Sequence, residues 1–321
     1  MKRLAELIGT LRLGRPRTFE GLTLYSLFGS AAPDARPGYR LLEEAIAAGE
    51  VEITEVSEGG QVPELLLVNH GKQPVLLLDG EELIGAKQNR VLNLSVLAPP
   101  GKTRLPVTCV EAGRWAWRER QFRPAGRTQF AEARADKLAQ VCASRSHGGG
   151  FHADQYAVWE GISEKARRLD VDSPTEAMAD LFERYGQDVE DHVRAFPPEP
   201  GQTGALFAVG HRLRGLELFD HPETLAASLP KLVRSYALDA IEWQQRADGR
   251  RHIPPRLDPW PFLDQVAQAE AQALPTVGLG EDLRLTGEGI RGAALHWEGR
   301  IVHLVVFDTH AKDSRSHRDR I

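Results

Sequence analysis

Short runs of apolar residues, many alternating with polar residues, follow one another through the first third of the chain. Segments rich in Gly, Asn and Pro separate these runs, which lie at 19–29, 51–56, 62–80, 89–101 and 105–117. Runs of this length and alternation predict β-strands. Because short turns join them, we expect antiparallel neighbours, as in a sandwich or an open barrel, and no βαβ units.

The middle of the chain changes to helical spacing. Apolar residues recur at intervals of three and four in 127–143 and 151–169, with a glycine-rich connection between the two segments. A third helix is predicted from Ser173, which can cap it, with Pro174 in the first turn and Glu176 reaching back to the cap amide. The proline-rich segment PPEPG ends that helix.

The last third mixes both patterns, with hairpins predicted at 204–220 and 290–308 and helices at 220–243 and 258–274. The fold class is therefore predicted as α+β: an antiparallel β-rich sandwich or open-barrel core, a helical middle segment and C-terminal hairpins. The predicted organisation is an N-terminal segment at 1–17, one compact domain at 18–308 and a disordered tail at 309–321. Within the domain, 18–120 is β-rich, 128–196 is helical and 203–308 is mixed.

Composition limits the function classes. Of 321 residues, 41% are hydrophobic and 26% charged, and the net charge of −5 gives no basic excess for nucleic-acid binding. Two cysteines indicate a reducing compartment, and no signal peptide or membrane-length apolar run is present, so we expect a cytoplasmic protein without a membrane partner. The histidine spacings match no metal motif, so no metal site is predicted, and no cofactor is identified.

One segment, 79–90, concentrates polar residues between two strand-like runs. The acids Glu81 and Glu82 precede the cations Lys87 and Arg90, and in an extended backbone the two acids face opposite ways. A second polar group follows about twenty residues later, in the sequence CVEAGRW. If the intervening strands are neighbours, the two groups meet.

Their combined chemistry favours recognition of a small anionic molecule with a ring. Carboxylates can act as general bases or bind ribose hydroxyls, guanidinium groups bind phosphate, and an indole stacks on a base. We expect catalytic roles for Glu81, Glu82 and Glu111, and ligand contacts from Lys87, Gln88, Asn89, Arg90, Arg114 and Trp115. The alternative is a surface ion-pair cluster that closes one end of a sheet.

The segment SHGGGFHADQYAVW adds a candidate lid. A glycine run before a helix can move, and Gln155 and Trp159 lie four residues apart on one helical face, so both can contact a ligand. The alternative is a plain linker followed by a core tryptophan.

The stretches LLLDGEELIGAKQNRVLN and LPVTCVEAGRW resemble the bacterial ARG-and-rhodanese-phosphatase-superfamily-associated domain family, as do DQYAVWEGI and PKLVRSYALDA. The last two contain Gln155 and Trp159, and Arg234, Ser235 and Asp239. The similarity runs from about Thr18 to about Asp308. It implies genomic association with ADP-ribose and NAD-derived metabolism, in RNA repair or defence, and it favours one compact unit.

Three functions fit these observations. The first is a protein that binds, and in an enzymatic version hydrolyses or transfers, an ADP-ribose-like or other nucleotide-derived ligand. The second is a non-enzymatic sensor that docks a protein partner through the same surface. The third is a glycoside-type hydrolase with two carboxylates at a defined separation, which the sequence does not fix. A deep pocket favours a ligand, whereas a flat apolar patch favours docking.

Overall fold

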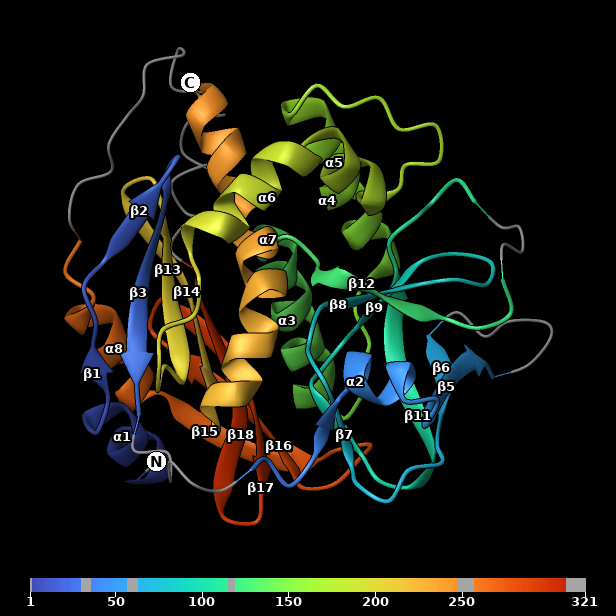
Figure 1. Cartoon of the computed structure of the whole chain (residues 1–321), viewed down its shortest axis with the longest axis horizontal. Helices are drawn as coiled ribbons and strands as arrows, with labels where there is room; N and C mark the ends of the chain where they lie inside the picture. The colour runs from blue at the N-terminus through green and yellow to red at the C-terminus, as the bar shows by residue number, and fades with distance from the viewer. Residues whose placement is uncertain (1, 30–35, 57–62, 115–118, 247–256, 310–321) are drawn as a thin grey trace.

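The computed structural model describes residues 2–29, 36–56, 63–114, 119–246 and 257–309 (Figure 1). Two β-sheets lie on either side of a central helical layer, and a small third sheet joins them from below. The helices are α1 (Lys2–Gly9), α2 (Leu42–Ala47), α3 (Ala131–Ser146), α4 (Gln155–Arg168), α5 (Met178–Arg184), α6 (Gly186–Ala195), α7 (Pro222–Arg246) and α8 (Trp260–Gln268). The tail predicted to be disordered lies, from residue 310 on, outside the described residues.

The larger sheet has nine strands in the order β1-β3-β13-β14-β18-β17-β16-β15, with β2 also paired to β3. Its strands are β1 (Arg12–Leu13), β2 (Arg17–Phe19), β3 (Leu22–Phe28), β13 (Gly204–Val209), β14 (Arg212–Phe219), β15 (Glu270–Pro275), β16 (Glu281–Gly287), β17 (Ile290–Trp297) and β18 (Arg300–Asp308). Both predicted C-terminal hairpins are present in it, as β13–β14 and β17–β18.

The second sheet has six strands in the order β12-β8-β9-β11-β6-β5, and the third has β10-β7-β4. Their strands are β4 (Arg40–Leu41), β5 (Val51–Glu55), β6 (Glu64–Asn69), β7 (Val75–Leu77), β8 (Glu81–Ile84), β9 (Arg90–Leu92), β10 (Val96–Ala98), β11 (Gly101–Cys109) and β12 (Arg123–Thr128). Among the described residues, pairings are antiparallel except that of β4 with β7. The α+β class and the antiparallel β-rich core are thus confirmed.

Apolar packing explains the layers. The largest hydrophobic cluster lies between α7, α3 and one face of the nine-stranded sheet, where Phe207, Leu232 and Phe307 are buried. α1 and α8 cover the opposite face through Leu4, Ile8 and others. Burial of these side chains is the main stabilising contribution to the arrangement. No helix of the described residues is long and apolar enough to cross a membrane.

The helix predicted from Ser173 begins five residues later, and two helices, α5 and α6, replace one. Residues ahead of α5 pair with the end of β11 instead: the Met178 amide donates to Val110 O (2.9 Å) and the Gly113 amide to Thr175 O (2.8 Å). Ser173 still accepts a backbone hydrogen bond, from Ala177. Tertiary pairing therefore decides where this helix starts.

Candidate functional site

The two predicted polar groups lie side by side. β9 pairs with β11, and this register sets Arg90 opposite Cys109, just ahead of Glu111. The Gln88 side-chain amide donates to Glu111 O (2.7 Å), and Arg114 Nη2 lies 2.7 Å from Glu111 Oε2. The adjacency inferred from the sequence is therefore present.

Glu81 and Glu82 point away from each other, as the extended backbone requires. Glu81 Oε1 lies 2.8 Å from Lys231 Nζ of α7. Glu82 accepts from Asn89 Nδ2 (3.2 Å) and from Arg127 Nε (2.5 Å). The two acids thus belong to separate ion pairs, and only Glu82 joins the Glu111 group, through Asn89.

The remaining predicted contacts divide by exposure. Arg90 is fully buried, donates to the backbone and side-chain oxygens of Gln88, and lies 3.6 Å from Glu55. Lys87 is half-buried. Trp115 lies outside the described residues.

Gln155 and Trp159 lie on α4, close to the same strand end. The Gln155 side chain pairs with the Cys109 backbone, accepting from its amide (2.9 Å) and donating to its carbonyl (2.8 Å). Trp159 is half-buried and packs edge-on against Tyr156, which is exposed. The Gln155 side chain therefore satisfies the backbone amide and carbonyl of Cys109, as the backbone of a neighbouring strand would.

The first polar group also holds the central helices in place. Asp79 Oδ1 lies 2.6 Å from Lys137 Nζ of α3 and its Oδ2 3.6 Å from Arg134 Nε. Gly80 has a φ of +77°, and a Cβ there would lie 2.7 Å from Arg134 Nε, so only glycine fits this turn. Together with the Glu81–Lys231 pair, these contacts attach α3 and α7 to the six-stranded sheet.

Burial changes the acidity of this group. Burial raises the pKa of Glu81 to about 7, the Lys231 ammonium opposes that shift, and the neighbouring Glu43 carboxylate adds to it. Glu43 also pairs with Lys231, so two carboxylates share one cation. Such pairs titrate in two steps, with the more buried acid keeping its proton to higher pH.

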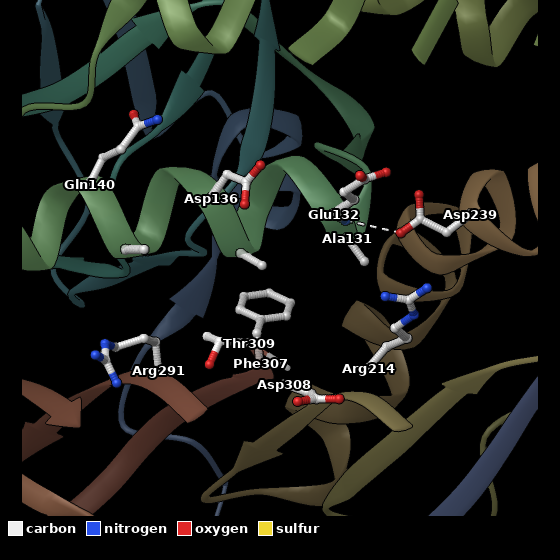
Figure 2. Close-up of a pocket in the computed structure, with 12 residues that line it drawn as sticks. Ala131, Glu132, Asp136, Gln140, Arg214, Asp239, Arg291, Phe307, Asp308 and Thr309 are labelled. Atoms are coloured by element: carbon white, nitrogen blue, oxygen red, sulfur yellow. Dashed lines mark hydrogen bonds between the residues drawn. The ribbon is translucent and has the colours of Figure 1, made fainter. Parts of the chain in front are cut away.

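A cavity of about 360 Å³ lies on the other side of α3, between that helix and the nine-stranded sheet (Figure 2). α3 contributes small and polar residues, β14, β17 and β18 form the opposite wall, and α7 closes one end. The lining residues are Ala131, Glu132, Ala135, Asp136, Ala139, Gln140, Arg214, Asp239, Arg291, Phe307, Asp308 and Thr309. None of the described residues that were predicted as ligand contacts is among them.

The arginines of this cavity differ from two of its acids, Asp239 and Glu132, in whether they form ion pairs. Neither Arg214 nor Arg291 has a carboxylate within ion-pair distance among the described residues, and Arg291 donates only to backbone carbonyls. By contrast, Asp239 lies 2.5 Å from Lys165, and Glu132 lies 2.9 Å from Arg168. Two of the acids that line the cavity are therefore paired with cations behind it, whereas its two arginines are not paired with described carboxylates.

Three carboxylates near the cavity, those of Glu132, Asp239 and Glu242, lie close enough together to hold a metal ion. The Lys165 ammonium already lies among them, at 2.5 Å from Asp239 and 2.6 Å from Glu242. Burial disfavours the charge of Glu242, yet Lys165 and Arg168 lower its pKa to about 2. Burial is the main cause that raises the pKa of Asp239. A lysine thus serves as the counter-ion here.

Comparison with known proteins was informative at the level of family. The sequence model described as "ARG and Rhodanese-Phosphatase-superfamily-associated Protein domain" matches residues 10–307. The chain belongs to this family. No curated protein and no solved structure matched the chain.

The sequence did not predict this cavity, although the pattern of residues in α3 marks the helical wall of it. Ala131, Ala135 and Ala139 recur every four residues, each followed by a polar residue, in the sequence AEARADKLAQ. That spacing places a small stripe and a polar stripe along one helix face. No comparable pattern marks Arg214 or Arg291, because their strands meet α3 only in the folded chain.

Proposed function

We propose that the cavity between α3 and the nine-stranded sheet binds a small anionic ligand that carries a ring, of the ADP-ribose-like or nucleotide-derived class. The observation that carries the proposal is the pairing pattern: Arg214 and Arg291 line the cavity, and neither lies within ion-pair distance of a carboxylate in the part of the chain that the structure describes. Arginine provides a planar set of donors suited to phosphate and carboxylate. The proposal keeps the ligand class favoured by the sequence and moves the site to a different face of α3.

The other walls suit the rest of such a ligand. In Figure 2 the Phe307 ring lies between α3 and the nine-stranded sheet, where it offers an apolar surface. Asp136 and Gln140 line the helical side, with oxygens that can accept from ribose hydroxyls. The volume of about 360 Å³ lies within the range typical of small-molecule sites.

Titration calorimetry with ADP-ribose, AMP, NAD and inorganic phosphate tests the proposal. Arg214→Ala and Arg291→Ala should each weaken binding by roughly 10- to 100-fold, because a charge-assisted hydrogen bond contributes about 1.5–3 kcal/mol. Ala135→Leu, which leaves every charge in place, should block the cavity and abolish binding.

Arg104→Ala is the matched control, since Arg104 is an exposed arginine of β11 that pairs with Glu64. It should bind as the wild type does. If the wild type binds none of the four compounds, the proposal is wrong. Binding that Arg214→Ala and Ala135→Leu leave unchanged would place the ligand elsewhere. Chromatography of the mixtures shows whether the ligand is also hydrolysed.

A further inference from the structure

A serine, a histidine and a glutamate form a continuous hydrogen-bonded chain away from the cavity. Ser95 Oγ lies 2.7 Å from His303 Nδ1, and His303 Nε2 lies 2.9 Å from Glu217 Oε2. Ser95 immediately precedes β10, whereas His303 and Glu217 lie on the paired strands β18 and β14. Three elements far apart in the sequence therefore assemble this chain.

For a neutral ring, the hydrogen bonds indicate which imidazole nitrogen is basic. A carboxylate oxygen only accepts, so His303 Nε2 carries the proton that Glu217 receives. Nδ1 of the neutral ring is then free to accept, and the Ser95 hydroxyl donates to it. The tautomer is the one in which the histidine can take a proton from the serine.

Surrounding groups hold each member of the chain. Arg134 Nη1 lies 2.7 Å from the other Glu217 oxygen, and the Phe219 ring stacks on His303 at 4.7 Å. The Asp79 amide donates to Ser95 Oγ (2.9 Å), which orients the hydroxyl toward the imidazole. The arrangement is pre-organised, as an activated nucleophile requires.

The exposed fraction of the side chains increases along this hydrogen-bonded series, from Glu217 to Ser95. Glu217 and His303 are 0% and 1% exposed, whereas Ser95 is only partly buried. A nucleophile must meet its substrate, whereas its base and the orienting acid work from behind it.

From this geometry we propose that Ser95 is a nucleophile for acyl transfer, with His303 as its general base and Glu217 as the positioning residue. The substrate class that this chemistry takes is a carboxylic ester. Ser95 Oγ attacks the carbonyl carbon while its proton passes to His303 Nδ1. The bond to the leaving oxygen breaks, and that oxygen receives the proton from Nδ1. Water, deprotonated by Nδ1, then attacks the acyl group, which releases the carboxylic acid and restores the Ser95 hydroxyl.

The serine bonds Nδ1 and the acid bonds Nε2, so the two ring nitrogens exchange the roles they have in the trypsin-like triad. Either nitrogen of a neutral imidazole can accept the proton, depending on which one carries the hydrogen. The chemistry therefore needs only the tautomer that Glu217 sets.

Labelling with a fluorophosphonate probe and mapping the adduct by mass spectrometry tests this proposal on the full chain. The wild type should carry the adduct on the peptide that contains Ser95, and Ser95→Ala should carry none there. His303→Gln can keep both hydrogen bonds but has no basic nitrogen, so the labelling rate should fall by about 100-fold or more.

Ser26→Ala is the control, because Ser26 bonds a carboxylate, that of Glu199, without an imidazole; it should label as the wild type does. Because the wild-type adduct is mapped on the unsubstituted chain, that part of the test does not depend on how well a variant folds. An unlabelled Ser95 in the wild type, or a labelling rate that His303→Gln leaves unchanged, would overturn the proposal.

Discussion

The two faces of α3 carry charge in opposite ways. On the inward face, Arg134 and Lys137 are fully buried, and Asp79 and Glu217 neutralise them. On the face toward the cavity, α3 lies opposite Arg214 of β14, which has no carboxylate within ion-pair distance among the described residues. One helix thus separates a network of buried ion pairs from a cavity whose two arginines lie beyond ion-pair distance of every described carboxylate.

The difference shows why residue type alone is a poor guide to a binding site. The segment 79–90 holds the chain's most conspicuous group of charges, yet Asp79 and Glu81 pair with lysines of α3 and α7. A buried charge whose partner is removed is costly, so such pairs have to be kept even if they bind nothing. Which charged side chains can bind a ligand is known only once the ion pairs within the folded protein are known.

Asp79→Ala should have the largest effect, because it leaves Lys137 and Arg134 buried without their shared partner. Loss of one member of a buried pair costs about 3–5 kcal/mol. Denaturant unfolding should show that decrease in the free energy of unfolding. Glu64→Ala, which breaks the exposed pair with Arg104, should cost less than about 1 kcal/mol. Equal costs for both variants would contradict the contrast between the two faces.

Glu81→Gln should change how stability depends on pH. The pKa of Glu81 is about 7 in the folded state against 4.5 ordinarily, so the folded protein binds more protons between these values. Its contribution to stability is therefore complete below about pH 4.5 and is lost as the pH rises through 7. Between pH 5 and 8, the wild type should lose roughly 2–3 kcal/mol more than the variant.

Glu43→Gln sharpens that test. It removes the second carboxylate on Lys231, which lowers the pKa of Glu81 and should reduce the pH dependence. Unfolding curves at several pH values measure both variants. A wild-type pH dependence that neither substitution alters would show that Glu81 does not titrate in this range.

Arg214→Ala should have the smallest effect on folding. Arg214 is half-buried and has no ion-pair partner among the described residues, so its loss leaves no charge stranded. We expect a change within about 0.5 kcal/mol in the free energy of unfolding. A larger loss, seen in thermal or denaturant unfolding, would mean that Arg214 supports the fold and that its effect on ligand binding is indirect.

Local pattern was enough to predict much of the fold. Period-two alternation and short turns predicted the antiparallel strands, and the β17–β18 hairpin turns at the predicted Glu298–Gly299. The predicted helix at 258–274 is wrong in its second half: α8 ends at Gln268, and Glu270–Pro275 is strand β15. Its alanines and glutamines favour a helix, but pairing with β16 outweighs that weak preference.

The site was less predictable for a physical reason. Sequence spacing correctly indicated that the groups around Arg90 and Glu111 meet, because neighbouring strands bring them together. It gave no measure of burial, and it did not link Arg214 on β14 with Asp136 on α3, which face one space only after the layers pack. Whether the 79–90 group also contacts a ligand stays a prediction.

The turn at Gly80 limits which residues related sequences can have at this position and at the Arg134 position. Arg134 fills the space that a side chain at position 80 would need, and the two residues are 54 positions apart in the printed sequence. A side chain at position 80 is therefore disfavoured twice, by the positive φ and by the Arg134 side chain. A relative that has lost this glycine should also have a shorter residue at the Arg134 position.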